Sequence, residues 1–565
     1  MTLLRNITGT LPMRLVSCAL SHLAQLPFTP ELLKTLSPQI TVELPHRRVA
    51  LLSRQNCVCM LQNLKANIQF VTKLPLQRRQ ALMDGLILCL GLAGVSSPQK
   101  QFVVLGPLTP FLNASTYLSI YRGILTQNVQ SITDYCYPPE TQPLLTSLLQ
   151  EPQMFGNPTQ WEALLLQRMD RLIFQFPERS LKSINMDSLS SRWVLQMLSE
   201  DNKWKISPLG AACFESESSD QRAARVVSQR TLLRLSIPAQ SLKRSSLPAP
   251  DCKTLRGSPA SAWGADILVR MTPTEFMDCL EYIGQNRDIS STELKSLLNR
   301  FLEINGPLTK IPPIHIARLG RLATKFSVSQ LKLIPLKDMQ LMEVLGRESE
   351  WTIRQMQALV NGFLTSRSLT VHDLDAVHLV ALGYSVCGLN SAAVEQLQPY
   401  EFCSAVLHLG SLLLACTEQQ LHAFTRLCTR SDIFGPVSDW TEEVFREMGS
   451  VAAGLQDLEL SSLVLEQIQG LSPLALSLMP PIKFAVSFSA IQLRMFSWSQ
   501  ALGVTNEQKS LLDNDQQKAL WVTLVGEDNG TQDYRAGISK GSHNSLSMAL
   551  GSCILFSILH TINVL

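Results

Sequence analysis

Four consecutive stretches of eight residues, from Phe488 to Ala519, share one pattern. Each begins with an apolar residue, continues with Ser, Thr or Asp, and carries a glutamine three residues after that polar position. The polar residues are Ser489, Ser497, Thr505 and Asp513, and the glutamines are Gln492, Gln500, Gln508 and Gln516. In a capping box, the polar side chain and the later Gln or Glu satisfy each other's backbone N–H groups. The pattern predicts helices of one or two turns that restart every eight residues. The alternative is a single amphipathic helix with coincidental spacing, but Ser, Thr and Asp are poor residues inside a helix.

Further capping boxes precede apolar-periodic runs elsewhere in the chain. They are Thr159 with Glu162, Thr272 with Glu275, Ser290 with Glu293, Ser327 with Gln330, Thr352 with Gln355, and Thr417 with Gln420. After Thr441, the apolar residues from Val444 to Leu455 have helical spacing, which predicts one helix with a buried side. Strand signals are scarce, and aromatic residues make up only 6% of the chain. These features favour an all-α fold.

A looser pattern places glycine after an apolar residue, as at Gly320, Gly383, Gly410 and Gly449. Its irregular spacing is typical of a degenerate array. The sequence therefore predicts a superhelical solenoid of short armadillo/HEAT-like helical repeats.

Changes in composition along the chain suggest five segments. Residues 1–213 form an N-terminal helical-repeat block, 214–264 a Ser/Pro/Arg-rich linker, 265–525 a C-terminal helical-repeat block, 526–547 a polar spacer, and 548–565 a hydrophobic tail. The linker contains Arg222-Ala-Ala-Arg225, which is a minimal processing sequence with Arg225 as the possible cleavage point.

Composition limits the classes of function. Hydrophobic residues make up 45% and charged residues 17%, which is incompatible with bulk disorder. The net charge of +3 gives no large field for a nucleic-acid backbone, so nucleic acid is not an expected partner. His372 and His378 bracket two aspartates, but a separation of six residues places them on different faces of a helix. No catalytic residue, cofactor, metal ligand or small-molecule substrate is predicted.

Thirteen cysteines are present. Cys553 lies in the hydrophobic tail, and the remaining twelve are an even number, which is compatible with disulfides in an oxidising compartment. The candidate disulfide cysteines are Cys387, Cys403, Cys416 and Cys428, with their connectivity left open.

The two ends of the chain favour different cellular locations for the protein. Residues 1–10 lack the basic and apolar regions of a signal peptide, so export requires a longer or alternative start. The tail follows small residues and a polar spacer, as in a glycosylphosphatidylinositol (GPI) signal. The attachment candidates are Ser539, with Gly541 two residues on, and Gly537. The alternatives are a membrane-spanning helix and a buried terminal helix.

Three sequons are N-glycosylation candidates. They lie at Asn6, Asn113 and Asn529.

Two stretches of the C-terminal block resemble a known family. Ile433–Leu455, which contains Trp440, and Gln467–Val486 are similar to sequences of the stereocilin, otoancorin and mesothelin family, and 350–352 and 378–383 resemble it more loosely. The resemblance implies an exported, superhelical protein without catalytic residues. It also implies a cell-surface adhesion or linkage role, connecting hair-cell stereocilia to one another and to the tectorial membrane, with extracellular matrix or cell-surface proteins as partners.

Two interpretations of function remain open. The first is an extracellular linkage protein held to the membrane by a lipid anchor, and the second is an intracellular armadillo-like interaction scaffold. Phe434, Trp440 and Trp498 are candidate contact aromatics, although core packing is the simpler role for each.

Overall fold

The computed structural model describes residues 27–92, 97–124, 129–236 and 248–525, together with Val16, Ala19, Leu20 and Leu23. Helices dominate these residues, and none of the elements described is a β-strand. The predicted all-α class is therefore confirmed for the described part of the chain.

The helices are short and numerous. The first group comprises α2 (Pro30–Thr35), α3 (Pro38–Val42), α4 (His46–Ala50), α5 (Arg54–Ala66), α6 (Ile68–Thr72), α7 (Leu76–Cys89), α8 (Pro98–Leu105), α9 (Ala114–Ile124), α10 (Gln142–Leu149), α11 (Ala163–Met169), α12 (Glu178–Leu181), α13 (Ser191–Lys205), α14 (Pro208–Ser216) and α15 (Ser219–Leu235). The second group comprises α16 (Cys252–Arg256), α17 (Ala260–Trp263), α18 (Ala265–Leu268), α19 (Pro273–Asp278), α20 (Leu280–Gln285), α21 (Ser291–Asn305), α22 (Pro313–Ala317), α23 (Val328–Leu331), α24 (Met339–Gly346), α25 (Ile353–Arg367), α26 (Ala376–Leu382), α27 (Ser391–Val394), α28 (Pro399–Gly410) and α29 (Glu418–Cys428). The third group comprises α30 (Glu442–Met448), α31 (Asp457–Ser461), α32 (Leu465–Gly470), α33 (Pro473–Leu478), α34 (Pro481–Ser487), α35 (Ala490–Arg494), α36 (Trp498–Gly503), α37 (Asn506–Leu511) and α38 (Asn514–Val525).

Short 3-10 helices lie between them. They are η2 (Gly106–Phe111), η3 (Val129–Ile132), η4 (Pro158–Gln160), η5 (Asp170–Gln175), η6 (Met186–Ser188), η8 (Leu308–Lys310), η9 (Gly320–Lys325), η10 (Val371–Asp373), η11 (Gly383–Gly388), η12 (Val437–Asp439) and η13 (Gly449–Gly454).

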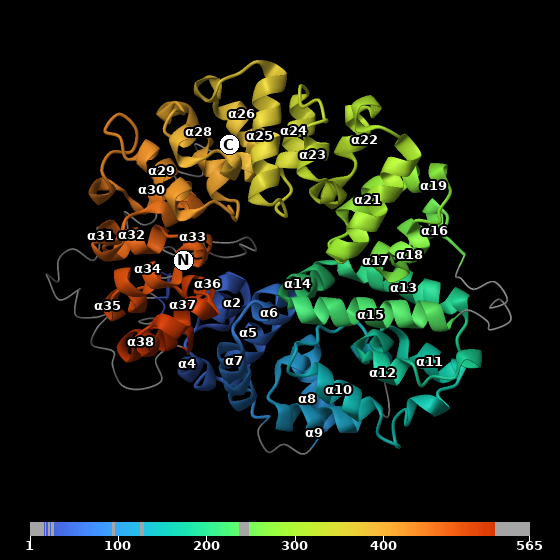
Figure 1. Cartoon of the computed structure of the whole chain (residues 1–565). Coiled ribbons are helices and arrows are strands. Elements are labelled where there is room, and N and C mark those ends of the chain that lie inside the picture. Colours follow the sequence, from blue (N-terminus) through green and yellow to red (C-terminus); the bar gives the residue numbers. More distant parts are fainter. Residues whose placement is uncertain are drawn as a thin grey trace, which may run out of the picture.

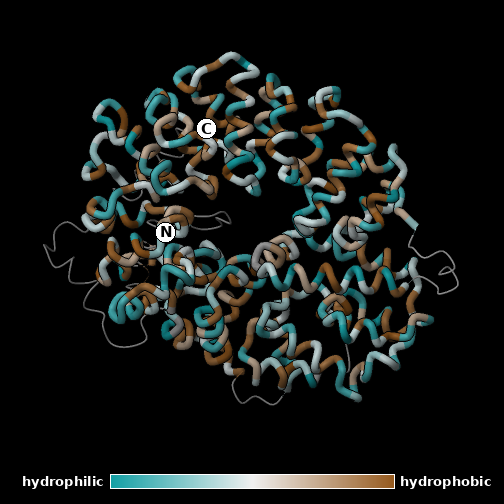
Figure 2. Tube along the Cα trace, viewed as in Figure 1, coloured by the Kyte–Doolittle hydropathy of each residue, from teal (hydrophilic) through white to brown (hydrophobic). Residues whose placement is uncertain are grey.

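Most helices pack on a helix two or three elements further along the chain. One row runs through α22, α24, α26, α28, α30 and α32, and near the C-terminal end α33 packs on α36, α34 on α37, and α35 on α38. Figure 1 shows that this succession follows a closed path, and α38 returns to contact α7. Apolar and polar residues alternate along the whole path in Figure 2. Accordingly, one continuous cluster of buried side chains extends from Val16 to Leu520.

A larger motif recurs along the path. A helix ends at or shortly before a residue with positive φ, and a six-residue 3-10 helix begins at that residue. The positive-φ residues are Gly106, Asp170, Gly320, Gly383 and Gly449. Several of them recur at intervals of roughly 65 residues, which is the self-similarity expected of an internal repeat.

Three of these glycines pack directly on a second glycine in the preceding turn. Gly320 meets the backbone of Gly284, Gly383 that of Gly346, and Gly449 that of Gly410. A Cβ atom at Gly320, Gly383 or Gly449 would collide with the backbone carbonyl of the partner glycine. The absence of a side chain therefore lets adjacent turns of backbone touch.

The first three octads of residues 488–519 form separate short helices, as predicted, and the fourth opens the twelve-residue helix α38. Reciprocal capping boxes occur at Ser489 with Gln492, Ser497 with Gln500, and Thr505 with Gln508. The apolar residue that opens each octad is buried. The single-helix alternative is therefore wrong.

Each octad glutamine also joins its helix to an earlier one. The Gln500 Oε1 atom accepts the Ser497 N–H at 2.8 Å, while Nε2 donates to the carbonyls of Ile468 at 2.6 Å and Leu471 at 2.8 Å. Gln492 and Gln508 likewise donate to carbonyls 29 and 32 residues earlier. We call this arrangement the glutamine clamp.

The other predicted capping boxes have mixed outcomes. Those beginning at Ser290, Ser327, Thr352 and Thr417 are confirmed. Thr272 caps α19, but Glu275 accepts the Cys252 N–H at 2.6 Å instead of completing the box. The box at Thr159 is wrong, because Asn157 caps η4 and α11 begins only at Ala163.

Two further predictions need correction. The predicted helix after Thr441 ends at Met448, because Gly449 has a φ of 52° and begins η13. The predicted linker is wrong for residues 219–235, where α15 forms and packs against α12, α13 and α17. Its Arg-rich sequence folds because ion pairs accompany the buried polar side chains.

We expect Gly383→Ala to destabilise the protein more than Gly435→Ala. Both glycines have positive φ, but a Cβ at Gly435 would meet nothing within 4 Å, whereas one at Gly383 would strike Gly346. Backbone strain alone costs about 1–3 kcal/mol. Chemical denaturation should therefore show a loss near that range for Gly435→Ala and a distinctly larger one for Gly383→Ala, and equal losses would contradict the backbone contact.

The glutamine clamp predicts a second stability difference. Gln500→Leu should lower the free energy of unfolding by about 2–4 kcal/mol, because buried polar groups lose their partners. The control is Gln396→Leu, since Gln396 is exposed and should tolerate the change. Thermal and denaturant unfolding of the two variants provides the measurement, and a small loss for Gln500→Leu would refute the clamp's contribution.

Candidate functional site

Five disulfide bonds lie within the described part of the chain. They are Cys57–Cys89, Cys136–Cys213, Cys252–Cys279, Cys387–Cys416 and Cys403–Cys428. The four candidate cysteines of the sequence thus occur as two pairs, and Cys59 is the free cysteine of the described residues. Cys18 and Cys553 lie outside those residues.

The disulfides join neighbouring turns. Four of them close separations of 25 to 32 residues, and Cys136–Cys213 closes one of 77. Closing a loop of such length stabilises a fold by about 3 kcal/mol or more in the chain-entropy description. The five bonds fit an oxidising, extracellular location.

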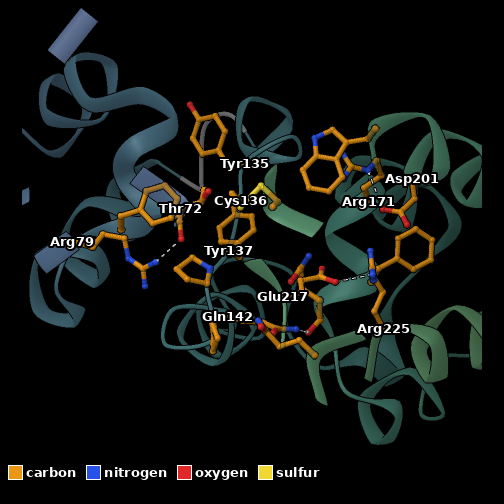
Figure 3. Close-up of a pocket in the computed structure, with 18 residues that line it drawn as sticks. Thr72, Arg79, Tyr135, Cys136, Tyr137, Gln142, Arg171, Asp201, Glu217 and Arg225 are labelled. Carbon is orange, nitrogen blue, oxygen red and sulfur yellow. Dashed lines mark hydrogen bonds and ion pairs between the residues drawn. A yellow bond between two sulfur atoms is a disulfide. The ribbon is translucent and has the colours of Figure 1, made fainter. Parts of the chain in front are cut away.

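A cluster of buried charges centres on Asp201 in α13 (Figure 3). The carboxylate accepts from Gln229 Nε2 at 2.8 Å and lies 3.3 Å from Lys205 Nζ and 3.5 Å from Arg171 Nε. Burial alone would raise the pKa of Asp201, but the charges of Lys205, Arg171 and Arg225 bring it below its ordinary value. The cluster is therefore held together by a charged carboxylate.

In Lys205 and Glu217, unlike in Asp201, the pKa shift disfavours the charged form. Burial lowers the pKa of Lys205, although Asp201 opposes that shift. Burial also raises the pKa of Glu217, although Arg225, 2.7 Å away, opposes it.

A cavity of about 70 Å³ opens beside this cluster. Its walls come from distant parts of the chain, including Thr72 and Arg79, the segment 135–139, and Glu217 and Arg225. The Cys136–Cys213 disulfide is part of the wall. The cavity thus lies at the junction of α6 and α7 with α13, α14 and α15.

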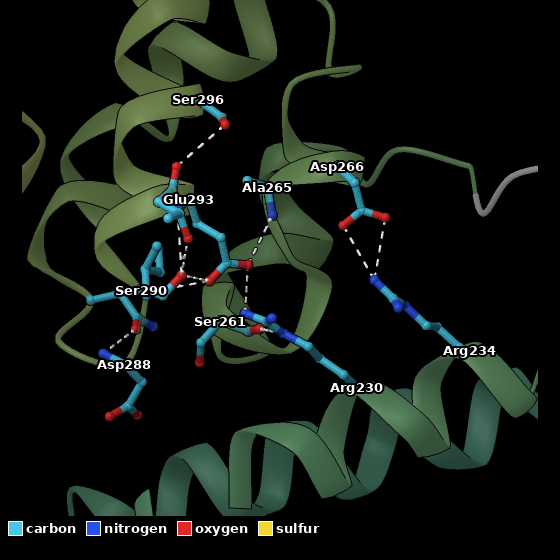
Figure 4. A network of polar contacts seen from close by, with 12 residues as sticks. Arg230, Arg234, Ser261, Ala265, Asp266, Asp288, Ser290, Glu293 and Ser296 are labelled. Atoms are coloured by element: carbon cyan, nitrogen blue, oxygen red, sulfur yellow. Dashed lines mark hydrogen bonds and ion pairs between the residues drawn. The ribbon is translucent and has the colours of Figure 1, made fainter. Parts of the chain in front are cut away.

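A second polar network attaches α15 to the following helices (Figure 4). Arg230 lies 2.7 Å from Glu293 and donates to the Ser261 carbonyl at 2.6 Å, and Arg234 pairs with Asp266 at 3.2 Å. Burial would raise the pKa of Glu293, but hydrogen bonds from Ser290 and Arg230 lower it. Helix α15 therefore connects the two blocks that the sequence analysis separated by a linker.

A larger groove of about 840 Å³ lies where the start of α15 meets the segments 284–290 and 347–350. Arg321 in its wall is paired with Glu350 at 2.6 Å. The groove carries charges of both signs, including Arg222, Arg287 and Glu348. Burial raises the pKa of Glu348, against the influence of Arg321. Such a lining suits a polar segment of a partner protein.

The predicted modification residues are placed as follows. Asn113 accepts the Thr116 N–H at 3.0 Å at the start of α9, and its Nδ2 atom donates to Asp84 at 3.1 Å. Arg225 is buried inside α15, so the folded chain does not present it as an extended cleavage site. Asn6, Asn529, Ser539 and Gly537 lie outside the described residues.

The candidate contact aromatics are largely internal. Trp440 is 2% exposed and donates its Nε1–H to the Gly435 carbonyl at 2.9 Å. Phe434 packs against Trp440 and, like Trp498, is half-buried. His372 and His378 have separate partners, Gln396 and Asp375.

Within the described ranges, His, Cys, Asp and Glu side chains form no group that could hold a metal ion. None of the helices described there is both long and apolar enough to cross a membrane.

Comparison with known proteins identifies relatives over most of the chain. Stereocilin from Homo sapiens is 30% identical over 523 residues, which is 92% of this chain and 29% of that protein. The chain is similar to the stereocilin family over most of its length. Stereocilin from Mus musculus is 30% identical over 88% of the chain, and otoancorin from Mus musculus is 26% identical over 47% of it. The chain spans less than a third of the length of these curated relatives.

The comparisons indicate no enzyme family. No protein-family model matches the chain, and no solved structure matches it.

The sequence carried a signal for the glutamine clamp but none for the cluster of buried charges. The choice of Gln over Glu in the octads signals that the side chain needs a donor as well as an acceptor. The buried charges gave no periodic signal, because their partners lie as far apart as Arg171 and Asp134, or Arg79 and Glu140.

We expect non-reducing peptide mapping of secreted protein to recover the five disulfides. After alkylation under native conditions, Cys59 should carry the label, whereas Cys387, Cys403, Cys416 and Cys428 should not. Their labelling in folded protein would count against both the pairing and an oxidising compartment.

Proposed function

We propose that this chain is a non-enzymatic, extracellular adhesion or linkage protein with a stereocilin-like role. In this role it connects hair-cell stereocilia to one another and to the tectorial membrane. The observation that carries the proposal is its 30% identity to stereocilin over 92% of the chain. The five disulfides support an extracellular setting.

The proposed architecture is a superhelical solenoid of armadillo/HEAT-like repeats. The recurring 3-10 motif and the contacts between elements two or three apart support it. In such an array each unit contacts mainly its neighbours, so a pull is passed from turn to turn. Glutamine clamps and disulfides at successive turns suit a protein that carries load.

The expected partners are proteins of the extracellular matrix or of cell surfaces. The groove at the start of α15 is the candidate contact surface, because Arg222 and Glu348 place charges of opposite sign in one large concavity. The polar lining of this groove favours selective binding of a complementary partner over nonspecific apolar adhesion.

We also propose that a GPI anchor holds the protein to the membrane, with Ser539 or Gly537 as the attachment residue. The hydrophobic tail and the preceding small residues support this. N-glycosylation at Asn6, Asn113 or Asn529 belongs to the same export route.

The alternative is an intracellular armadillo-like scaffold. Cytosolic thiols are kept reduced, so the five disulfides count against it.

Expression of the full chain behind a supplied signal peptide tests the proposal. Intact cells should display the protein, phosphatidylinositol-specific phospholipase C should release it, and a glycosidase should reduce its apparent mass. Cells bearing the protein should bind isolated tectorial membrane, and the phospholipase should remove that binding. The matched control replaces Ser539 and Gly537 with bulky residues, which should prevent anchoring without altering secretion. An unglycosylated protein retained inside the cell would favour the scaffold.

A further inference from the structure

Exposed apolar side chains are concentrated near the C-terminal end of the described chain. Among the described residues, nine of the 25 large apolar side chains that are exposed lie between Leu458 and Trp521. Single exposed apolar residues are normal on a protein surface, whereas a contiguous group marks a site of contact with a protein or a membrane. The relative positions of these nine side chains therefore matter more than their number.

Helices α31, α34 and α37 stack as one row. Helix α34 packs on both of the others, and Figure 1 shows the three in succession on the left of the closed path. Gln508 aligns α37 with α34, because it donates to the Met479 carbonyl, two residues before α34 begins. Gln492, five residues after α34 ends, donates to the Leu460 carbonyl near the end of α31. Residues at the same position in these helices therefore lie at about the same level of the row.

Four exposed apolar residues occupy matching positions in this row. Leu458 and Ile482 are the second residues of α31 and α34. Val486 and Leu511 are the sixth residues of α34 and α37. Ile482 and Val486 are four residues apart, so they lie on one side of α34 and join the two pairs. The exposed fractions are 81%, 71%, 66% and 49% for Leu458, Ile482, Val486 and Leu511. We call these four residues the apolar face.

The apolar face lies close to the proposed lipid anchor along the chain. Only helix α38 follows it in the described residues, and twelve to fourteen residues separate Val525 from Gly537 and Ser539. Such a connection spans at most about 50 Å, even when fully extended. Helix α38 adds Trp521, which is 55% exposed, and tryptophan favours the boundary between water and lipid. An anchored protein therefore keeps this face within reach of the bilayer.

The charges beside the apolar face favour a neutral bilayer over a second copy of the chain. Asp457 and Glu507 are exposed on its helices, whereas Lys509 is half-buried. Two copies facing each other through this face would bring exposed charges of one sign together. A zwitterionic headgroup layer has no net charge to repel them, and the lipid beneath it accepts apolar side chains.

We propose that the apolar face rests on the outer surface of a neutral lipid bilayer, next to the lipid anchor. This inference rests on the proposed GPI anchor, which supplies the closeness. Ile482 and Val486 insert at the boundary between headgroups and acyl chains, with Leu458 and Leu511 on either side. Because the anchor already holds the protein at the surface, a weak contact is enough to be occupied. The contact gives the helical array a fixed direction relative to the membrane.

Protein released from intact cells by phosphatidylinositol-specific phospholipase C tests the apolar face without its anchor. The released protein keeps the folded chain but carries no acyl chains, so any binding to vesicles belongs to the protein. Flotation with phosphatidylcholine vesicles should recover part of it. Raising the salt concentration should not weaken this binding, because the contact is apolar. Ile482→Asp should lower the partition coefficient roughly tenfold or more.

Ile314→Asp is the matched control. Ile314, like Ile482, is the second residue of a short helix, follows two prolines and is largely exposed, at 64%. An acidic residue in the first turn of a helix is favourable, so both variants should fold with unchanged unfolding temperatures. Ile314→Asp should bind vesicles as the unaltered protein does. Val486→Asp replaces Ile482→Asp, with the same expectation, if that variant does not fold.

Three results would overturn the proposal, and each has a different meaning. Released protein that does not float with vesicles, or that loses as much binding in Ile314→Asp as in Ile482→Asp, refutes the apolar face but leaves the anchor intact. Protein that the phospholipase does not release refutes the anchor, and with it the reason for placing this face at a bilayer. A dimer in sedimentation that Ile482→Asp separates, without vesicle binding, assigns the face to a second copy.

Discussion

The structure depends on side-chain amides that satisfy two neighbouring helices at once. In Gln492, Gln500 and Gln508, one amide atom accepts an N–H at the start of its own helix and the other donates to carbonyls of an earlier helix. Helices of five or six residues are unstable alone, because nucleation costs more than so few internal hydrogen bonds return. The clamp removes this difficulty, since the unsatisfied ends of two helices complete each other through one residue. Its fixed reach also sets the length of chain in each turn.

The Gln or Glu residue of a capping box can also bond backbone groups of a neighbouring helix. Gln355, which closes the box at Thr352, donates to the carbonyl groups of Thr324 and Phe326. Glu293, which closes the box at Ser290, accepts from the Ala265 N–H and pairs with Arg230. The reason is that a carboxylate has no hydrogen to donate, whereas an amide has both functions. In these two boxes, the choice between Gln and Glu matches whether the neighbouring backbone groups are carbonyls or N–H donors.

The helix starts were predictable because their capping partners are close in sequence. The buried charges and helix α15 were not, because their partners are distant in sequence. The boxes at Ser327, Thr352 and Thr417 could be read from four residues each, since all the partners are local. The positive-φ motif was only partly visible, because Asp170 occupies a position that is glycine elsewhere. Helix α15 was mistaken for a linker, because burial of Arg225 depends on Glu217 and Phe214, whose positions the fold supplies. The cavity was unpredictable for the same reason.

The junction around Asp201 follows a different principle from the rest of the path. Elsewhere, adjacent turns meet mainly through apolar side chains, glycine contacts and amides, and ion pairs such as Arg230–Glu293 and Arg234–Asp266 are partly exposed. Here α7, α13 and α15 meet through buried ions, and a buried ion is tolerated only where its partners are complete. The longest-range disulfide, Cys136–Cys213, lies in this same wall and holds it without charge. The fold therefore places a cluster of buried ions at one junction, where a disulfide reinforces the same wall.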